Sequence, residues 1–302
     1  MNEYQLLRKK HFDAAVAQTG FQTQESLTAS FQIPKNLFSE LQKTVMDYLY
    51  TSSHHAAVKK EVLSDFLEAF SSKAKNVSTS GIVIPKSYCD LAFTNVHRVI
   101  AEVMTQSNLR EGAEFWIYPF NIRLKGAVKT SDVLSYPTEL PHSETWVGCS
   151  KRSVLLHIPV LGDMENNLLK VWKPGAEMNA DWLRPLASYH DANELIRNSQ
   201  ELSVSSQAGQ VLMVDSSLLH GTYRHPNAGP RVSIDLNVVL KNYSNDIFPD
   251  EHNLLAERQK LSSQDFFEIG KSLRVHSPDG DGDIFSPVDG MRHPANIKIV
   301  KS

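Results

Sequence analysis

The stretch AEFWIYPFNIRLKG (residues 113–126) marks a change in the texture of the sequence. β-Branched and aromatic residues dominate it, as is typical of a strand. Six further short segments of this kind, bounded by Gly, Pro, Asn or Asp, follow it: HSETWVG (142–148), SVLLHIPVLG (153–162), NLLKVWKP (167–174), ELSVSSQ (201–207), QVLMVDS (210–216) and RVSIDLNVVLKN (231–242). Only HDANELIRNS (190–199) predicts a helix between them. Successive short strands without regular helices favour an antiparallel sandwich or jelly roll over a parallel α/β sheet.

The residues before this stretch have a helical pattern instead. Apolar residues recur every three to four positions, which predicts helices with one buried stripe. The segments concerned are PKNLFSELQKTVMDYLY (34–50), HHAAVKKEVLSDFLEAF (54–70) and SYCDLAFTNVHRVIAEVM (87–104). Ser87 is a candidate N-cap for the third. After residue 242, PDEHNLLAERQKL (249–261) and SSQDFFEIGKSL (262–273) predict two more helices, before a tail rich in Gly, Asp and Pro.

These patterns together predict one domain of the α+β class that is mainly β. Residues 1–112 are expected to form a helical support region. Residues 113–242 are expected to form a jelly-roll core, and residues 243–302 the C-terminal helices and loop tail. A chain of 302 residues is long enough to bury a full core in one elaborated domain.

The composition is that of a soluble globular protein, with 41% hydrophobic and 22% charged residues. A net charge of −3 and a pI near 6.5 give no electrostatic reason to expect nucleic acid or an anionic membrane as a partner. Neither an apolar leader after the N-terminal charges nor a run of apolar residues long enough to span a bilayer is present. Cys89 and Cys149 stand far apart and outside any C-x-x-C motif, which favours a reducing compartment. We therefore expect a cytoplasmic protein.

His142 and Glu144 form an H-x-E pair. In an extended strand, side chains two residues apart project to the same face, so the imidazole and the carboxylate converge. A third partner is available in His220, which follows a predicted strand and precedes Gly221, where the chain can turn or approach closely. Two imidazoles and one carboxylate on one side of a metal form the facial triad of non-haem Fe(II) sites, which leaves positions open.

Three other histidines compete with His220 for the third position. His157 lies in an apolar strand, where a hydrogen-bonded core histidine is the expected role. His190 begins a predicted surface helix, and His225 lies in a loop six residues before Arg231. His220 is therefore the preferred ligand.

Arg231 and Ser233 stand at strand spacing, eleven and thirteen residues after His220. If their strand lies beside the one that ends near His220, both face the interior that holds the metal. A buried guanidinium needs an anion, and a ligand carboxylate can bind it in bidentate fashion. Arg123 either points into the barrel towards a co-substrate or lies on the solvent face of an edge strand. Trp146 continues the alternation of the H-x-E pair, so it either walls a substrate pocket or packs in the core.

The order of His142-x-Glu144, His220 and Arg231-x-Ser233 resembles the Fe(II)/2-oxoglutarate-dependent oxygenases of the double-stranded β-helix fold. The resemblance covers roughly residues 113–241. It implies that the triad binds Fe(II), that 2-oxoglutarate and O2 are co-substrates, and that Arg231 holds the far carboxylate of 2-oxoglutarate. Glu144 stands where many members carry Asp. Its presence argues against the halogenating branch, which resembles this pattern with a small residue there.

The segments HSETWVG (142–148) and LLHGTYRHPNAGPRVS (218–233) resemble the corresponding segments of bacterial family members that act on small metabolites, including sugar and antibiotic-pathway hydroxylases. The resemblance thus implies oxidation of an unactivated C–H bond with release of succinate and CO2. Two alternatives stay open. One is a zinc hydrolase that uses the same residues, although no H-E-x-x-H helix is present. The other is a jelly-roll binding protein without catalysis. The sequence leaves open the oligomeric state, the substrate, and whether residues 129–141 form a lid.

Overall fold

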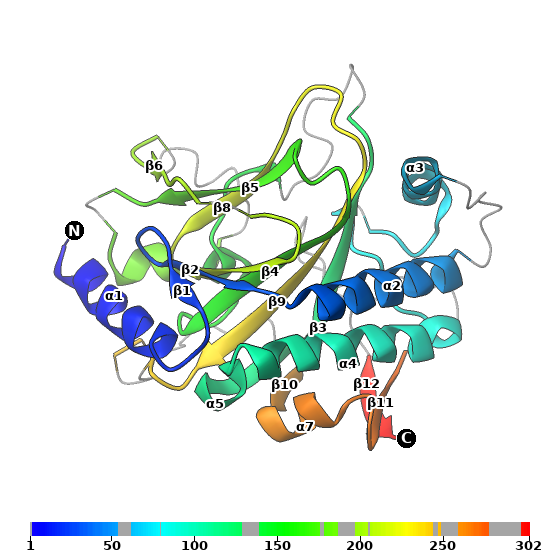
Figure 1. The fold of residues 1–302 in the computed structure, drawn as a ribbon. Helices are drawn as coiled ribbons and strands as arrows, with labels where there is room; N and C mark the ends of the chain where they lie inside the picture. The colour runs from blue at the N-terminus through cyan, green and yellow to red at the C-terminus, as the bar shows by residue number, and fades with distance from the viewer. Residues whose placement is uncertain are drawn as a thin grey trace.

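A computed structural model describes residues 2–53, 62–78, 80–128, 139–175, 178–186, 197–204, 206–243, 247–248, 259–277 and 297–302 (Figure 1). Its centre consists of two antiparallel sheets that face each other across a small cavity. Side chains from both sheets line that cavity. The larger sheet has seven strands in the order β1-β2-β7-β4-β9-β3-β10 and the smaller has the order β6-β5-β8. A separate pair, β11-β12, lies near the C-terminus.

The bounds of the larger sheet's strands are β1 (Gln22–Thr23), β2 (Thr28–Gln32), β7 (Gln210–Asp215), β4 (Ser153–Gly162), β9 (Arg231–Leu240), β3 (Ala113–Lys125) and β10 (Gln259–Ser262). Those of the smaller sheet are β6 (Gln200–Glu201), β5 (Asn167–Lys173) and β8 (Leu219–Arg224). The C-terminal pair is β11 (Leu273–His276) and β12 (Lys298–Lys301). Strands from outside residues 113–242 thus extend the larger sheet at both of its edges.

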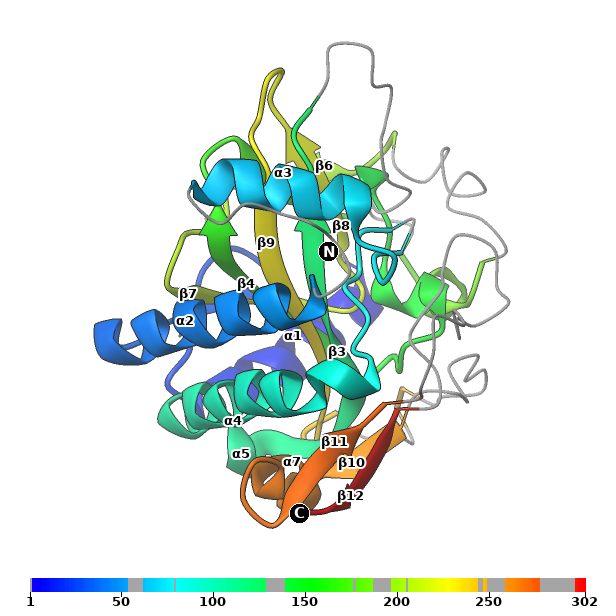
Figure 2. The same cartoon turned by 90° about the vertical axis from the view of Figure 1, so that its right-hand side faces the viewer.

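Helices cover the outer face of the larger sheet (Figure 2). α2 (Lys35–Ser52) and α4 (Asp90–Gln106) pack on each other, and Phe93 of α4 stacks on Phe120 of β3 with ring centroids 4.8 Å apart. The strands β4 and β9 are therefore buried on both faces, which explains their almost continuous apolar runs. The other α-helices in the described ranges are α1 (Glu3–Val16), α3 (Leu63–Lys73), α5 (Leu109–Gly112) and α7 (Ser263–Glu268). No helix within the described ranges combines the length and apolar character needed to cross a membrane.

Most of the predicted core strands are confirmed, and β4 has the predicted bounds. The predicted strand at 142–148 is wrong beyond its first residues, because residues Glu144–Val147 form the 3-10 turn η3. The segment 201–207 contributes only its first residue to a strand. At 259–261 the predicted helix is wrong, because β10 pairs with the edge of β3 there. Ser87 does not cap α4; it begins the short 3-10 helix η1 (Ser87–Cys89), and Cys89 precedes α4.

Some predictions fall outside the described residues. They concern the helix at 190–199 up to residue 196, the helical segment at 54–61, the helix at 249–258 and the candidate lid up to residue 138. Within the described part, the sequence pattern missed α1, β1, β2, α5, β8 and the C-terminal pair of β11 and β12. Of these, β8 matters most, because it carries His220.

A buried ion pair joins α1 to the end of β7, just before the turn that leads into β8. Arg8 Nη2 lies 2.8 Å and 3.0 Å from the two carboxylate oxygens of Asp215, and both side chains are fully buried. Tyr243 donates its hydroxyl to the same carboxylate at 2.6 Å. The guanidinium also lies over the rings of Tyr243 and Phe248. This network therefore fixes the turn from which the strand of His220 starts.

Replacing Arg8 by methionine is expected to destabilise the protein by about 3–5 kcal/mol, because Asp215 is left as a buried charge without its cation. Lys9→Met is the matched control: Lys9 pairs with Asp13 on the exposed face of the same helix, and the loss of such a pair costs about 0.5 kcal/mol or less. Urea unfolding of both variants measures the difference. Equal, small losses in the two variants would show that the buried pair does not anchor α1.

Candidate metal centre

Backbone pairing brings His142 and His220 side by side. The His142 N–H donates to the carbonyl of His220 at 2.9 Å, and the His220 N–H donates to the carbonyl of His142 at 2.8 Å. This single bridge places the segment of His142 beside β8, on the smaller sheet. The two imidazole rings then lie 4.5 Å apart between their centroids. Two residues 78 positions apart in the sequence are thus held together by main-chain hydrogen bonds.

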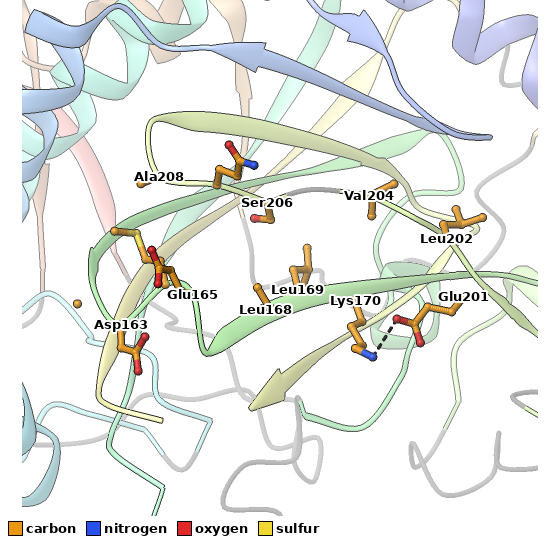
Figure 3. Close-up of a pocket in the computed structure, with 13 residues that line it drawn as sticks. Asp163, Glu165, Leu168, Leu169, Lys170, Glu201, Leu202, Val204, Ser206 and Ala208 are labelled. Carbon is orange, nitrogen blue, oxygen red and sulfur yellow. Dashed lines mark ion pairs between the residues drawn. The ribbon is translucent and has the colours of Figure 1, made fainter. Parts of the chain in front are cut away.

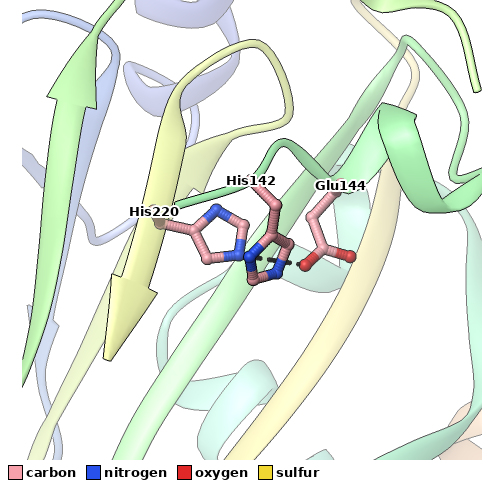
Figure 4. Close-up of side chains that lie close together, drawn as sticks. All are labelled: His142, Glu144 and His220. Atoms are coloured by element: carbon pink, nitrogen blue, oxygen red, sulfur yellow. Dashed lines mark hydrogen bonds and ion pairs between the residues drawn. The ribbon is translucent and has the colours of Figure 1, made fainter. Parts of the chain in front are cut away.

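A turn, and not a strand, brings Glu144 to the two histidines. The Ser143 hydroxyl accepts a hydrogen bond from the backbone N–H of Thr145 and donates to the carbonyl of Ser216 at 2.5 Å, which starts the η3 turn. Glu144 Oε1 lies 3.1 Å from His220 Nε2, and the three side chains converge (Figure 4). Their possible ligand atoms all lie within 4.8 Å of one another. The predicted convergence is therefore present, although the predicted strand is not.

The geometry and protonation of the triad fit a metal ion. Two ligand atoms about 2.1 Å from one ion and at right angles to each other lie about 3 Å apart, which is close to the 3.1 Å between His220 Nε2 and Glu144 Oε1. His142 Nδ1 donates to the carbonyl of Leu140 at 2.8 Å, which leaves the lone pair of Nε2 for a ligand. The three ligand residues are at most 7% exposed.

The electrostatics of the triad also favour the metal-binding protonation states. Burial and the neighbouring His220 lower the pKa of His142 to about 3, so its imidazole is neutral at physiological pH. Burial opposes ionisation of Glu144, but the neighbouring imidazole of His220 and the hydrogen bond from Asn237 hold the pKa of its carboxyl well below the usual range. A neutral imidazole and an ionised carboxylate are the forms that bind a metal.

Asn237 supports Glu144 from the larger sheet, and the sequence did not single it out. Its amide Nδ2 donates to Glu144 Oε2 at 2.8 Å, and the thiol of Cys149 lies 3.3 Å from the same oxygen. The signal in the sequence was the alternation along β9, in which Asn237 follows Arg231 and Ser233 on one face. Asn237 thus orients the carboxylate of Glu144 through Oε2, the oxygen that does not contact His220.

Replacing Asn237 by alanine is expected to weaken metal binding by about 10–100-fold, since it removes a partner that orients a ligating carboxylate. Asn121→Ala is the control: Asn121 is also buried but stands on β3, and no hydrogen bond within the described residues joins it to the triad. Competition with a metal-sensitive dye measures both dissociation constants. If both variants bind the metal like the wild type, the amide of Asn237 does not orient Glu144.

Side chains from both sheets line the small cavity around the triad. Besides the triad, they are Arg123, Leu155, His157, Leu169, Thr222, Arg231 and Asp235. A larger hollow of about 780 Å³ lies nearby, between the β4–β5 connection, β5 and residues 201–204 and 206–208 (Figure 3). Leu169 lines both spaces, but no triad residue lines the larger one. The site is therefore identified by its donor atoms and not by the size of the hollow.

Arg231 is a buried cation at the first position of β9. It is 1% exposed, and its Nη1 and Nη2 donate to the carbonyl of Asn167 at 2.9 Å and the hydroxyl of Ser233 at 3.4 Å. Its Nε has no hydrogen-bond partner, and no carboxylate of the described residues forms an ion pair with it. Burial lowers its pKa to about 10, so it stays charged. A buried guanidinium of this kind is a candidate anion site.

Gly162 allows β4 to lie close to this arginine. Its φ is +83°, a conformation that favours glycine. A Cβ at this position would meet the carbonyl oxygen of Pro230 at 2.1 Å and the Cα of Arg231 at 3.1 Å. The close approach of the two strands therefore requires glycine.

Of the other residues considered from the sequence, Arg123 and His157 line the cavity and Trp146 does not. Arg123 lines the cavity, but its Nε donates to Asp235 at 2.5 Å. Trp146 is not among the residues that line the cavity. Because η3 replaces the expected strand, its ring packs instead with Trp182 and Leu219, and its indole N–H donates to the carbonyl of Trp182. Its contact with a substrate stays a prediction. His157, expected in the core, is buried but lines the cavity.

The two remaining rival histidines do not join the triad in the described part of the chain. His225 is exposed and packs edge-on against Tyr223, while His190 lies outside the described residues. Among the described residues, His142, Glu144 and His220 are the one set of His, Cys, Asp or Glu side chains whose possible ligand atoms lie close enough together to hold a metal ion.

No protein-family model and no curated protein sequence matches the chain. Solved structures with a similar backbone fold include the non-heme α-ketoglutarate-dependent carbocyclase SnoK from nogalamycin biosynthesis. Its sequence is 11% identical, the TM-score is 0.47, and the match covers 97% of this chain and 96% of that one. The epimerase SnoN in complex with Fe3+, α-ketoglutarate and nogalamycin RO has 12% identity, a TM-score of 0.42 and coverages of 80% and 90%.

EctD from S. alaskensis with bound Fe has 13% identity, a TM-score of 0.39, and coverage of 79% of this chain and 78% of that one. At identities this low and TM-scores below 0.5, the likeness carries no argument about function. The function of this chain is therefore inferred from its own side chains.

Proposed function

We propose that the chain is a non-haem Fe(II)/2-oxoglutarate-dependent oxygenase that hydroxylates, or otherwise oxidises, an unactivated C–H bond of a small metabolite. The observation that carries this proposal is Arg231. It is a buried guanidinium without an acidic partner among the described residues, and it lines the same cavity as a buried triad of two histidines and a glutamate. A candidate metal triad and an unpaired guanidinium on the walls of one cavity suit a dicarboxylate that binds the metal at one end and, after side chains rearrange, the arginine at the other.

The strand order supports a double-stranded β-helix. In chain order, the core segments alternate between the two sheets: β3 and β4 belong to the larger sheet, and the segment of His142 between them pairs with the smaller. β5 and β6 lie in the smaller sheet, β7 in the larger, β8 in the smaller and β9 in the larger. Sheets built by this alternation are typical of a double-layered jelly roll. We propose that residues 113–242 are its catalytic core, with the regions before and after as support.

In this proposal, His142 Nε2, His220 Nε2 and Glu144 Oε1 hold the ion on one side and leave its other side for ligands. The bound ion supplies the redox chemistry, in which RH, O2 and 2-oxoglutarate give ROH, succinate and CO2. Arg231 binds the distal carboxylate of 2-oxoglutarate, with support from the Ser233 hydroxyl. Arg123 contributes positive potential to the same cavity, although Asp235 pairs with its charge.

Binding of the co-substrate requires side chains to rearrange. The space beside the triad is about 20 Å³, which holds little more than one water molecule. Arg231 must therefore exchange its bonds to Asn167 and Ser233 for bonds to the ligand. Because the three ligand residues are almost completely buried, the group that reaches the ion must be slender, which favours a small metabolite. Cys89 and Cys149 form no disulfide among the described residues, which supports an action in the reducing cytoplasm.

A succinate-release screen tests the proposed reaction. The protein is incubated with Fe(II), ascorbate and 2-oxoglutarate, together with amino acids, sugars and pathway metabolites in turn. We expect at least one compound to raise succinate formation above the level without substrate, and the compound to gain an oxygen or lose hydrogen by mass spectrometry. Protein loaded with Zn²⁺ is the control, since zinc has no redox chemistry. Equal succinate formation with Zn²⁺ and Fe(II) would contradict the proposal.

A further inference from the structure

A buried chain of three side chains crosses the larger sheet beside the metal centre. Arg123 of β3 donates from Nε to Asp235 Oδ2 at 2.5 Å, and His157 of β4 pairs through Nδ1 with Asp235 Oδ1 at 2.7 Å. Asp235 stands on β9, between the two other strands. The side chains are 14% (Arg123), 13% (Asp235) and 2% (His157) exposed. All three line the cavity of the metal centre.

This chain determines which nitrogen of His157 is available to a ligand. Although burial opposes ionisation of Asp235, the hydrogen bond from His157 and the charge of Arg123 hold the pKa of its carboxyl well below the usual range. An ionised carboxylate only accepts hydrogen bonds, so the proton of His157 is on Nδ1. Nε2 is then the available atom, and it is buried without a hydrogen-bond partner among the residues that the structure describes. A buried polar atom without a partner costs free energy unless a ligand satisfies it.

The register of the strands places His157 between the two ends of the proposed co-substrate site. Asn237, which bonds to Glu144, stands at one end of the inner row of β9, and Arg231 stands at the other. His157 pairs directly with Asp235, which is two residues from Asn237 and four from Arg231. At about 3.3 Å per residue, these separations are about 7 Å and about 13 Å. A ligand that joins the metal to the Arg231 guanidinium therefore passes His157.

The charges around His157 oppose its protonation in the free protein and favour it in the complex. Burial lowers its pKa; Asp235 raises it, and Arg231 of β9 and His220 of β8 lower it. Arg123 of β3 acts through Asp235, whose charge it partly offsets. A dianion that binds the metal and Arg231 places negative charge beside His157 and offsets the positive charge of the Arg231 guanidinium. An unprotonated Nε2 would also present its lone pair to a ligand that has only acceptor atoms.

We propose that His157 is a second binding group for the 2-oxo acid co-substrate, and that it takes up a proton when this dianion binds. Nε2 takes the proton from solvent and donates it in a hydrogen bond to a ligand oxygen, while Asp235 keeps its charge and orients the ring. Asp235 and Arg123 are positioning residues that act through His157. This inference rests on the proposed function, because it requires 2-oxoglutarate in the cavity.

Calorimetry of 2-oxoglutarate binding to Mn²⁺-loaded protein tests the inference without turnover. Titrations at neutral pH in two buffers of different ionisation enthalpy measure the protons exchanged on binding. We expect the wild type to take up about one proton per 2-oxoglutarate bound. His157→Gln places a neutral amide near the position of Nε2, so it should bind 2-oxoglutarate without this proton uptake. The difference between the two proteins removes any contribution from metal-bound water.

His157→Asn separates a binding role from a purely structural one. Its amide lies near the position of Nδ1, so it keeps a hydrogen bond to Asp235 but places nothing at Nε2. We expect it to bind 2-oxoglutarate about tenfold more weakly or worse, because a charge-assisted hydrogen bond is lost, while its affinity for Mn²⁺ and its melting temperature stay near those of the wild type. A structural role predicts the opposite order, with Asn tolerated and Gln not.

The outcomes distinguish this inference from the proposed function. If Mn²⁺-loaded wild type binds no 2-oxoglutarate, both are overturned. If it binds 2-oxoglutarate with the same heat in both buffers, or if His157→Asn binds it like the wild type, only the inference is overturned. Should His157→Asn fail to fold, the proton count of the wild type against His157→Gln still decides.

Discussion

Replacing His142 or His220 by alanine is expected to abolish metal-dependent turnover of 2-oxoglutarate. Each change removes one of three ligand atoms that lie within 4.8 Å of one another. It also leaves the Glu144 carboxylate with one neighbouring imidazole instead of two, at a position where burial disfavours its charge. An ion held by one imidazole and one carboxylate loses the facial arrangement that the chemistry needs. Metal content after loading and desalting, and succinate formation, measure the result.

His225→Ala is the matched control for these variants. His225 is exposed and contacts Tyr223, and it takes no part in the triad. The control should retain the metal and form succinate at the wild-type rate. Undiminished succinate formation in both His142→Ala and His220→Ala would refute the assignment of the metal centre.

Replacing Arg231 by methionine is expected to weaken 2-oxoglutarate binding by about a hundredfold or more, because two charge-assisted hydrogen bonds at about 1.5–3 kcal/mol each are lost. The stability of the free protein should not fall in proportion. Arg231 is a buried cation without an acidic partner in the described part of the chain, and replacing such a charge by an apolar side chain of similar length removes a desolvation cost. The expected result is therefore a loss of affinity without a loss of fold.

Two further variants make the test of Arg231 specific. Arg231→Lys keeps the charge but not the planar fork, so it should recover only part of the affinity. Arg98→Ala is the control, because Arg98 forms an exposed ion pair with Glu40 on the helical side of the molecule. The dissociation constant of 2-oxoglutarate from Mn²⁺-loaded protein and the urea unfolding midpoint are measured for each. An unchanged affinity in Arg231→Met would place the carboxylate anchor elsewhere.

The features that the sequence predicted well are those with a strong local pattern. The strands β3, β4 and β9 follow predicted segments closely, because both faces of these strands are buried and their apolar runs are long. The helix α2 follows from its apolar stripe in the same way. The triad was found through the order of its residues, and the main-chain bridge between His142 and His220 explains why that order places them together.

The features that it missed depend on partners that are distant in the sequence. The short strands β2 and β10 exist because they pair with β7 and β3, and their own residues carry little strand pattern. The turn η3 depends on the bond from Ser143 to the carbonyl of Ser216. Local alternation at 142–148 therefore predicted a strand where η3 forms, and the ring of Trp146 packs with Trp182 and Leu219.

His157 shows the same limit at the site. An apolar strand predicted a core histidine, and its burial agrees. Its partner Asp235 is 78 positions away, and the spacing of residues within β4 gives no sign of it. The role of this histidine becomes visible only when three strands are brought side by side.

The most direct measurement of the central claim is anaerobic titration of the Fe(II)-loaded protein with 2-oxoglutarate, followed by visible absorption. If the triad and Arg231 together hold the ion and the co-substrate, a charge-transfer band develops and saturates at one 2-oxoglutarate per iron, and it is absent in His220→Ala. A protein that binds Fe(II) but develops no band at any concentration of 2-oxoglutarate would contradict the account.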